Sequence, residues 1–311
     1  MNSKGNRILV ALDGSDHALE AVKYVGKISP FKRMKVVLFH VYDKHPEYYR
    51  DLEKMPQIDH EMQEEIEALE MRQEDALQEH MGKAKQILLD AGFDSDFIDV
   101  KIQVVEKGIA RDLINEAGNQ YRAVVVGRRK TDELEPHVLG SVSTKLIHKL
   151  DFAPLWVIGN APKPGKILLA VDGSEGAMGA VDYVGSTLVG SDFEITLVHV
   201  IRGEESLKSG YHVPLLLTSF LEKAKEEISE YLATARRHLL ESGVQPNQIS
   251  TKIITEAKSR SGAIFEEAQQ GGYGTIVVGR RGLSKVREFF MGRVSYKLIH
   301  IAKGHAVWLV N

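Results

Sequence analysis

The 311-residue sequence contains no cysteine, which excludes disulfide bonds, cysteine-ligated zinc and thiol catalysis. It also lacks any run of about 18 apolar residues, so no segment is expected to span a membrane. Its first residues, MNSKGNRILVALDG, contain no apolar stretch long enough for a signal peptide. The net charge is only −3, which argues against a surface tuned to nucleic acid or anionic membrane. We therefore expect a soluble cytoplasmic protein.

One unit occurs twice in the sequence. The segment ILVALDGSDHALEAVKYVG (residues 8–26) returns as ILLAVDGSEGAMGAVDYVG (residues 167–185), with 12 of 19 positions identical. VVVGRR and VSTKLIHKL return as IVVGRR and VSYKLIHIA. A period this long excludes a solenoid and indicates two homologous domains. We place domain 1 at residues 1–160 and domain 2 at residues 161–311, joined near the segment GNAPKPG.

Short apolar runs alternate with helical patterns in each copy. Ser15 follows the first run and is expected to cap a helix. In the first copy the predicted strands are residues 8–12, 35–42, 98–105, 123–126 and 155–158, and further helices are predicted at residues 58–89, 110–117 and 140–150. Five strands alternating with four helices predict an α/β fold. Each copy should form a doubly wound, Rossmann-like domain with a five-stranded parallel sheet.

A ligand site is expected where strand order reverses, beyond the carboxyl ends of the strands. Polar and glycine residues follow the first and fourth predicted strands of each copy: Asp13 and Gly127, then Asp172 and Gly279. Glycines let backbone amides approach a ligand, and a helix N-terminus favours an anion. This combination predicts a nucleotide, with phosphates at the glycine loop and the nucleoside toward the aspartate.

The order of these motifs resembles the universal stress protein family. The resemblance is carried by strand-Asp-Gly-Ser, by His-Val at the end of the second strand, and by Gly-x-x-Gly-(nine residues)-Gly-Ser/Thr. It covers nearly the whole chain and implies ATP binding, with or without Mg²⁺ or Mn²⁺, in members that keep the full glycine motif. The implied nucleotide-binding residues are Asp13, Val41, Gly127, Gly140, Ser141, Val142 and Ser143 in domain 1, and Asp172, Val200, Gly279, Arg280, Gly282, Gly292, Arg293, Val294 and Ser295 in domain 2.

Both copies depart from the full motif. In domain 1, Lys130 replaces the second glycine, and the following gap TDELEPHVL is acidic. Domain 2 keeps all three glycines, but Arg293 replaces Ser or Thr. A lysine that replaces a glycine needed for positive φ or close approach costs about 1 kcal/mol or blocks the phosphate. Arginine can still bind phosphate. We therefore expect the two sites to differ in ATP binding, with domain 2 favoured over domain 1.

Other roles compete for the same residues. The arginines after the fourth strand of domain 2 either neutralise phosphates or form a solvated loop. Because no aromatic platform or nucleic-acid motif accompanies them, we expect no nucleic-acid partner. Asp13 and Asp172 fit ligand contact or helix capping better than catalysis. His40 and His199 fit core histidines better than metal ligands, and the serines fit phosphate contact or capping better than a nucleophile.

The last strands, PLWVI and AVWLV, are apolar edges that invite pairing, so we expect an intramolecular pseudo-dimer and leave homodimerisation open. The leading hypothesis is a stress-response or regulatory protein that binds ATP and an unidentified protein partner. One alternative is a nucleotide-free interaction module with degenerate loops. An ATP hydrolase or adenylating enzyme is less favoured, since no water-activating base and no Walker-type loop is evident.

Overall fold

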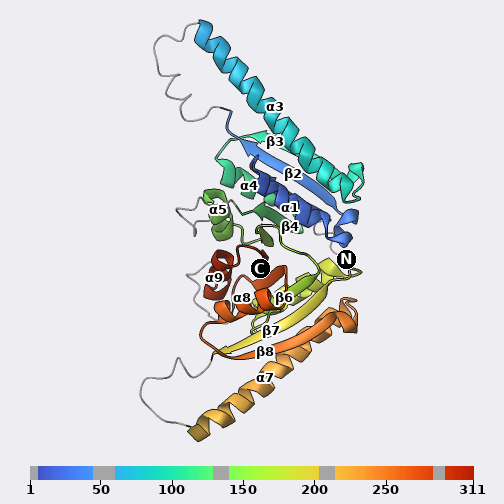
Figure 1. The fold of residues 1–311 in the computed structure, drawn as a ribbon, viewed down its shortest axis with the longest axis vertical. Coiled ribbons are helices and arrows are strands. Elements are labelled where there is room, and N and C mark those ends of the chain that lie inside the picture. Colours follow the sequence, from blue (N-terminus) through green and yellow to red (C-terminus); the bar gives the residue numbers. More distant parts are fainter. Residues whose placement is uncertain (1–5, 45–59, 129–139, 203–213, 283–290) are drawn as a thin grey trace.

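The computed structural model of the chain describes residues 6–44, 60–128, 140–202, 214–282 and 291–311 (Figure 1). Domain 1 contains β1 (Arg7–Leu12), α1 (Asp16–Gly26), β2 (Lys35–Tyr42), α3 (His60–Asp90), β3 (Ile98–Val104), α4 (Ile109–Ala117), β4 (Ala123–Gly127), α5 (Ser141–Lys149) and β5 (Leu155–Ile158). Domain 2 contains β6 (Lys166–Ala170), α6 (Glu175–Leu188), β7 (Glu194–Arg202), α7 (Pro214–Glu241), β8 (Ile249–Ala257), α8 (Arg260–Gln270), β9 (Thr275–Gly279), α9 (Arg293–Ile301) and β10 (Ala306–Val310).

The described strands form one ten-stranded sheet in the order β3-β2-β1-β4-β5-β10-β9-β6-β7-β8. Every neighbouring pair is parallel except β5 and β10, which are antiparallel. In domain 1 the chain runs outward from β1 to β2 and β3, then returns to β4 on the other side of β1. The strand order therefore reverses between β1 and β4, as the sequence predicts, and between β6 and β9 in domain 2.

Helices cover both faces of the sheet, which makes each domain doubly wound. One buried apolar cluster joins the sheet to α1, α3, α6 and α7, and a second joins it to α4, α5, α8 and α9. Each cluster includes residues of both domains. Because both faces are covered, strands such as β4 and β5 are apolar throughout rather than alternating.

The two domains meet where β5 pairs with β10. Trp156 faces Trp308 in this register, and the two indole rings stack at 3.7 Å between centroids with no solvent exposure. Tyr24 Oη lies 2.6 Å from Thr275 Oγ1, and Tyr183 Oη donates to the Arg122 carbonyl across the same boundary. The expected intramolecular pseudo-dimer is therefore confirmed, since each apolar edge strand covers the other.

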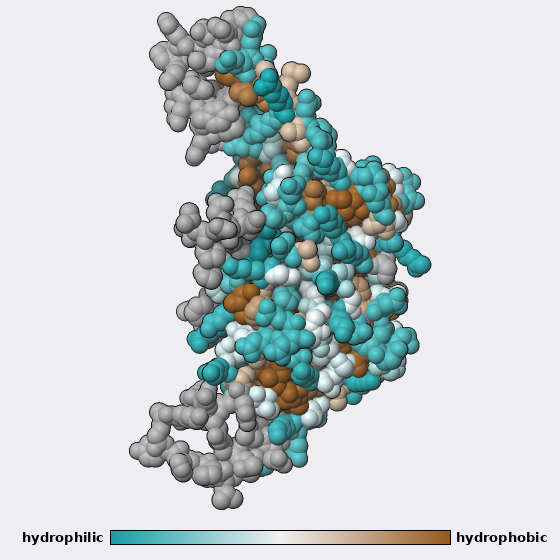
Figure 2. All heavy atoms as spheres, viewed as in Figure 1, coloured by the Kyte–Doolittle hydropathy of each residue, from teal (hydrophilic) through white to brown (hydrophobic). Residues whose placement is uncertain are grey.

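The long helices α3 and α7 extend beyond the sheet at opposite ends of the molecule (Figure 1). The later part of α3 packs on the core through Leu77, Met81, Ala84 and Leu88. On the face shown in Figure 2, hydrophilic side chains predominate and the hydrophobic ones form small, separate patches. Among the described residues, no helix combines the length and apolarity that crossing a membrane requires.

Candidate functional site

The turn between β1 and α1 sets the position of the first predicted site residue. Gly14 has φ +78°, a left-handed conformation that suits glycine. The Ser15 hydroxyl accepts a hydrogen bond from Ala18 N at 3.3 Å, so the predicted helix cap is confirmed. Asp13 Oδ1 accepts from Ser15 N at 3.1 Å and from Ser15 Oγ at 2.5 Å. These bonds fix the Asp13 carboxylate at the carboxyl end of β1.

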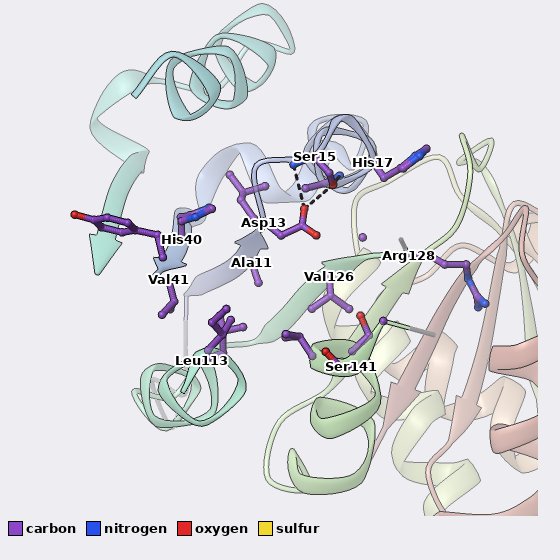
Figure 3. A pocket seen from close by; sticks show the side chains of 18 of the residues that line it. Ala11, Asp13, Ser15, His17, His40, Val41, Leu113, Val126, Arg128 and Ser141 are labelled. Atoms are coloured by element: carbon purple, nitrogen blue, oxygen red, sulfur yellow. Dashed lines mark hydrogen bonds between the residues drawn. The ribbon is translucent and has the colours of Figure 1, made fainter. Parts of the chain in front are cut away.

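A cavity of about 330 Å³ opens at this end of the domain 1 sheet (Figure 3). Strands β1, β2 and β4 and helices α1, α4 and α5 contribute to its walls. All seven residues predicted for domain 1 line it: Asp13, Val41, Gly127, Gly140, Ser141, Val142 and Ser143. The strand-order reversal thus brings together residues that are more than a hundred positions apart in the sequence.

The start of α5 gives one wall of this cavity an anion-binding character. Gly140 is its N-cap residue, and no side chain among the described residues caps the helix. The first amides of a helix have no intrahelical acceptor, and the helix dipole favours negative charge beside them. Ser141 and Ser143 add hydroxyls, and the neighbouring Asp13, Val41 and Val142 make the site mixed rather than wholly polar.

Gly127 is required by packing as well as by the cavity. A Cβ at this position would lie 2.8 Å from the His17 carbonyl oxygen and 3.1 Å from Ala18 Cα. In domain 2, a Cβ at Gly279 would lie 2.6 Å from the Gly176 carbonyl carbon. Both glycines therefore allow the fourth strand of each domain to pass the first turn of a helix, a reason that the sequence analysis did not foresee.

The second strand of each domain contributes a histidine, which is buried in domain 1 and half-buried in domain 2. His40 lines the domain 1 cavity, and its Nδ1 has no hydrogen-bond partner among the described residues. His199 Nδ1 lies 2.7 Å from the Val171 carbonyl oxygen, so His199 matches the expected core histidine more fully than His40. Burial lowers the pKa of both imidazoles, which favours their neutral forms at neutral pH.

The matching residues of domain 2 are arranged more tightly. Asp172 again accepts from Ser174 N and Oγ, but its side chain also approaches Gly282, where a Cβ would lie 2.5 Å from Asp172 Oδ2. Gly292 N donates to the Arg280 carbonyl at 2.8 Å. No equivalent bond joins Gly140 to Arg128 in the described part of domain 1.

A glycine on α6 permits this tight arrangement. A Cβ at Gly176 would overlap the carbonyl oxygen of Arg281, so the loop after β9 lies directly against the start of α6. The corresponding position on α1 is His17, whose side chain lines the domain 1 cavity. His17, which the sequence analysis did not single out, thus marks a difference between the two sites.

The structure corrects the expectation for the Arg280 side chain. Its guanidinium is buried and binds carbonyls of domain 1 instead of facing the loop of domain 2. Arg128, at the same position of domain 1, also points from the cavity edge toward domain 2 in Figure 3 and donates to the Ile299 carbonyl. Burial lowers the pKa of each of these arginines to about 10, which leaves both charged at neutral pH.

The remaining predicted residues of domain 2 divide by exposure. Arg293 is exposed at the first position of α9, whereas Val200 is buried and Val294 half-buried. The Ser295 hydroxyl donates to the Gly279 carbonyl at 2.7 Å, so it ties α9 to β9.

Lys130, the acidic gap 131–139 and residues 283–290 lie outside the described residues. The described residues contain no cluster of three or more His, Asp or Glu side chains that could hold a metal ion.

Two tandem doubly wound domains, with a mixed polar and apolar cavity at the strand-order reversal of domain 1, define a Rossmann-like α/β architecture. The model of the Universal stress protein family matches residues 5–158 and 164–310. The chain belongs to the universal stress protein family, as its motifs predict.

Similarity to individual proteins agrees with this membership. Universal stress protein YxiE of Bacillus subtilis is 28% identical over 142 residues, which cover 44% of this chain and 93% of that protein. A universal stress protein structure from Archaeoglobus fulgidus covers 99% of both chains at 20% identity, with a TM-score of 0.58. A putative universal stress protein from Pseudomonas aeruginosa covers 98% of this chain and 92% of that chain at 14% identity, with a TM-score of 0.55. At these identities the two structures show a shared fold.

Proposed function

We propose that this chain is a regulatory stress-response protein that binds ATP in the domain 1 cavity. The observation that carries the proposal is the convergence of all seven predicted domain 1 residues on one cavity. Its volume of about 330 Å³ lies within the range of small-molecule sites. The proposed activity is binding rather than turnover, and nucleotide occupancy would control association with a protein partner.

Each wall of the cavity suits one part of a nucleotide. The Asp13 carboxylate can accept hydrogen bonds from ribose hydroxyls. Apolar groups of Val41, Leu113 and Val126 can contact the base. The start of α5, which no described side chain caps, can receive phosphate oxygens together with Ser141. A Mg²⁺ or Mn²⁺ ion would accompany the phosphates as a counter-ion.

This assignment reverses the preference for domain 2 that the glycine count suggested. In domain 2 the loop after β9 lies against Gly176, and Asp172 extends to Gly282. Asp172 is half-buried, whereas Asp13 is exposed to the cavity. The domain with the complete glycine motif therefore has the tighter arrangement, and domain 1 has the more accessible aspartate.

Two steps test the proposal. Heat denaturation of the freshly purified protein, with chromatography of the supernatant, measures bound nucleotide per chain. Titration with ATP and Mg²⁺ then compares Asp13→Asn with Asp172→Asn, since each amide keeps an oxygen for its Ser15 or Ser174 contact. We expect Asp13→Asn to weaken ATP binding about tenfold or more, because a hydrogen bond to a charged group is lost. The matched Asp172→Asn should bind like wild type.

The alternatives predict different results. Absence of both bound nucleotide and titratable ATP binding would support a nucleotide-free interaction module. Equal losses in the two variants would place nucleotide in both domains, and loss in Asp172→Asn alone would restore domain 2. Repeated release of phosphate or pyrophosphate per chain would identify an enzyme instead.

A further inference from the structure

The backbone of Arg280 makes its hydrogen bonds within domain 2. It directly follows β9, its N–H donates to the Val310 carbonyl at 2.6 Å, and its own carbonyl accepts from Gly292 N at 2.8 Å. Gly292 is the N-cap residue of α9. The backbone of Arg280 therefore links the end of β9 to β10 and to the start of α9.

The side chain of Arg280 reaches into domain 1. It is only 2% exposed, and it donates from Nη1 to the Ile147 carbonyl and from Nη2 to the Leu150 carbonyl, both at 2.5 Å. Nε donates to Asn311 Oδ1, also at 2.5 Å. All three sides of the guanidinium are thus occupied, two of them by the end of α5.

Arg280 contacts the end of α5 that is opposite to the cavity. The last carbonyls of a helix have no intrahelical donors, and a cation beside them complements the helix dipole. α5 has nine residues and spans about 13 Å, so its two ends move together. Its opposite end, from Gly140 to Ser143, lines the domain 1 cavity. Arg280 therefore holds the far end of the helix whose near end forms the proposed phosphate wall.

Arg128 makes the reciprocal connection, but a weaker one. It donates to the Ile299 carbonyl in the last turn of α9, while its Nε has no partner among the described residues. The position that corresponds to Asn311 is Gly159, where a Cβ would lie only 2.6 Å from the His305 carbonyl oxygen. Since no side chain fits there, domain 1 cannot supply the third bond that Arg280 receives in domain 2.

We propose that Arg280 is a positioning residue for the domain 1 nucleotide site and couples that site to the end of β9 in domain 2 through α5. This inference rests on the proposed function, because it concerns the affinity of the domain 1 cavity. We expect the contact of Arg280 with α5 to be stronger than that of Arg128 with α9, because the Arg280 guanidinium makes two bonds to the helix end. A shift of Arg280 at the end of β9 would move the end of α5 and alter phosphate binding in domain 1.

The test uses the full chain and two readouts. Arg280→Gln removes the charge and at least one of the two bonds to α5. We expect amide hydrogen exchange in residues 141–149 to rise about tenfold and ATP affinity to fall about fivefold or more. Arg280→Lys keeps the charge and can reach one carbonyl, so it should give intermediate values. Arg281→Gln changes the adjacent exposed arginine and should leave both readouts at wild-type values.

Several results would overturn the inference. Faster exchange throughout β6, β7 and β8 with unchanged ATP affinity would show a general stability role. Unchanged exchange in α5 would show that Arg280 does not hold that helix. If wild type binds no ATP, the proposed function fails and the positioning role fails with it. Hydrogen exchange in α5 would then still show whether Arg280 holds the end of that helix. The reciprocal variant Arg128→Gln should instead speed exchange in α9. Equal effects of one variant on both helices would contradict the inference that Arg280 holds α5 and Arg128 holds α9.

Discussion

Domain 1 and domain 2 share their packing and differ in their ligand-facing residues. The turns Asp13-Gly14-Ser15 and Asp172-Gly173-Ser174 make the same hydrogen bonds, with matching distances of 3.1 and 2.5 Å from Ser N and Oγ to the aspartate. By contrast, His17 lines a cavity where Gly176 lies under a loop carbonyl. The duplicated architecture is therefore retained in the turns after β1 and β6, and it diverges at the first turn of the helices that follow them.

This difference means that the glycine motif alone does not decide which domain has the more accessible site. Gly127 and Gly279 have a packing role that exists with or without a nucleotide. Gly282 is absent from the positive-φ glycines, so its value lies in the space that it leaves beside Asp172 rather than in backbone freedom. Exposure of the aspartate separates the two domains more directly, since Asp13 is exposed and Asp172 is half-buried.

The largest expected effect tests what the domains share. Gly127→Ala and Gly279→Ala each place a methyl group less than 3 Å from helix backbone that cannot turn aside. We expect each change to lower the free energy of unfolding by about 1–3 kcal/mol, since overpacking outweighs the entropy gained by removing a glycine. Urea unfolding measures both variants against wild type.

Gly304→Ala is the matched control for these two substitutions, because nothing lies within 4 Å of its added methyl group. It should unfold close to wild type. If Gly127→Ala alone were tolerated, the first turn of α1 would be less tightly packed than that of α6, and the shared packing would be confined to domain 2.

A smaller effect tests what the domains do not share. Gly282→Lys gives domain 2 the residue type found at Lys130, and its Cβ displaces only the flexible Asp172 carboxylate. We expect the free energy of unfolding to change by no more than about 0.5 kcal/mol. ATP stoichiometry and affinity should also stay at wild-type values if domain 1 holds the nucleotide. A large loss of ATP binding would instead assign the site to domain 2.

Much of this architecture could be predicted because it depends on local patterns. The apolar runs, the Ser15 cap and the repeat itself gave the strands, the first helix and the doubly wound order. The apolar edges predicted that β5 and β10 pair, but not the register that places Trp156 opposite Trp308. Residue type and spacing also selected seven domain 1 residues, all of which line the cavity.

The remaining features depend on contacts between distant segments. The sequence places Arg280 beside a glycine loop, which suggests phosphate, but it does not show that the end of α5 lies within reach of the guanidinium. Likewise, the role of Gly176 depends on where the Arg281 carbonyl falls. Such contacts follow from how the two domains pack, and no local pattern encodes them.

The smallest expected effect concerns the histidines of the two sites. Burial lowers the pKa of His40 and His80 in domain 1 and of His199 in domain 2. His80 Nε2 has no hydrogen bond among the described residues, whereas the position matching it in α7 is Tyr231, whose ring meets His199 edge-on. At these matching positions domain 1 thus has a buried and a half-buried histidine, where domain 2 has a half-buried histidine and a tyrosine.

The sign of the pH effect follows from these lowered pKa values. The native state binds fewer protons than the unfolded state, whose histidines titrate near pH 6.5. The stabilisation is therefore complete above about pH 6.5 and is lost as the pH falls through the lower native pKa values. His80→Tyr gives domain 1 the pair found in domain 2 and removes one such group. Thermal unfolding between about pH 7.5 and 5.5 should show a shallower loss of Tm for His80→Tyr than for wild type. An unchanged slope would mean that His80 does not contribute to the acid sensitivity, and that the two sites titrate alike despite their different partners.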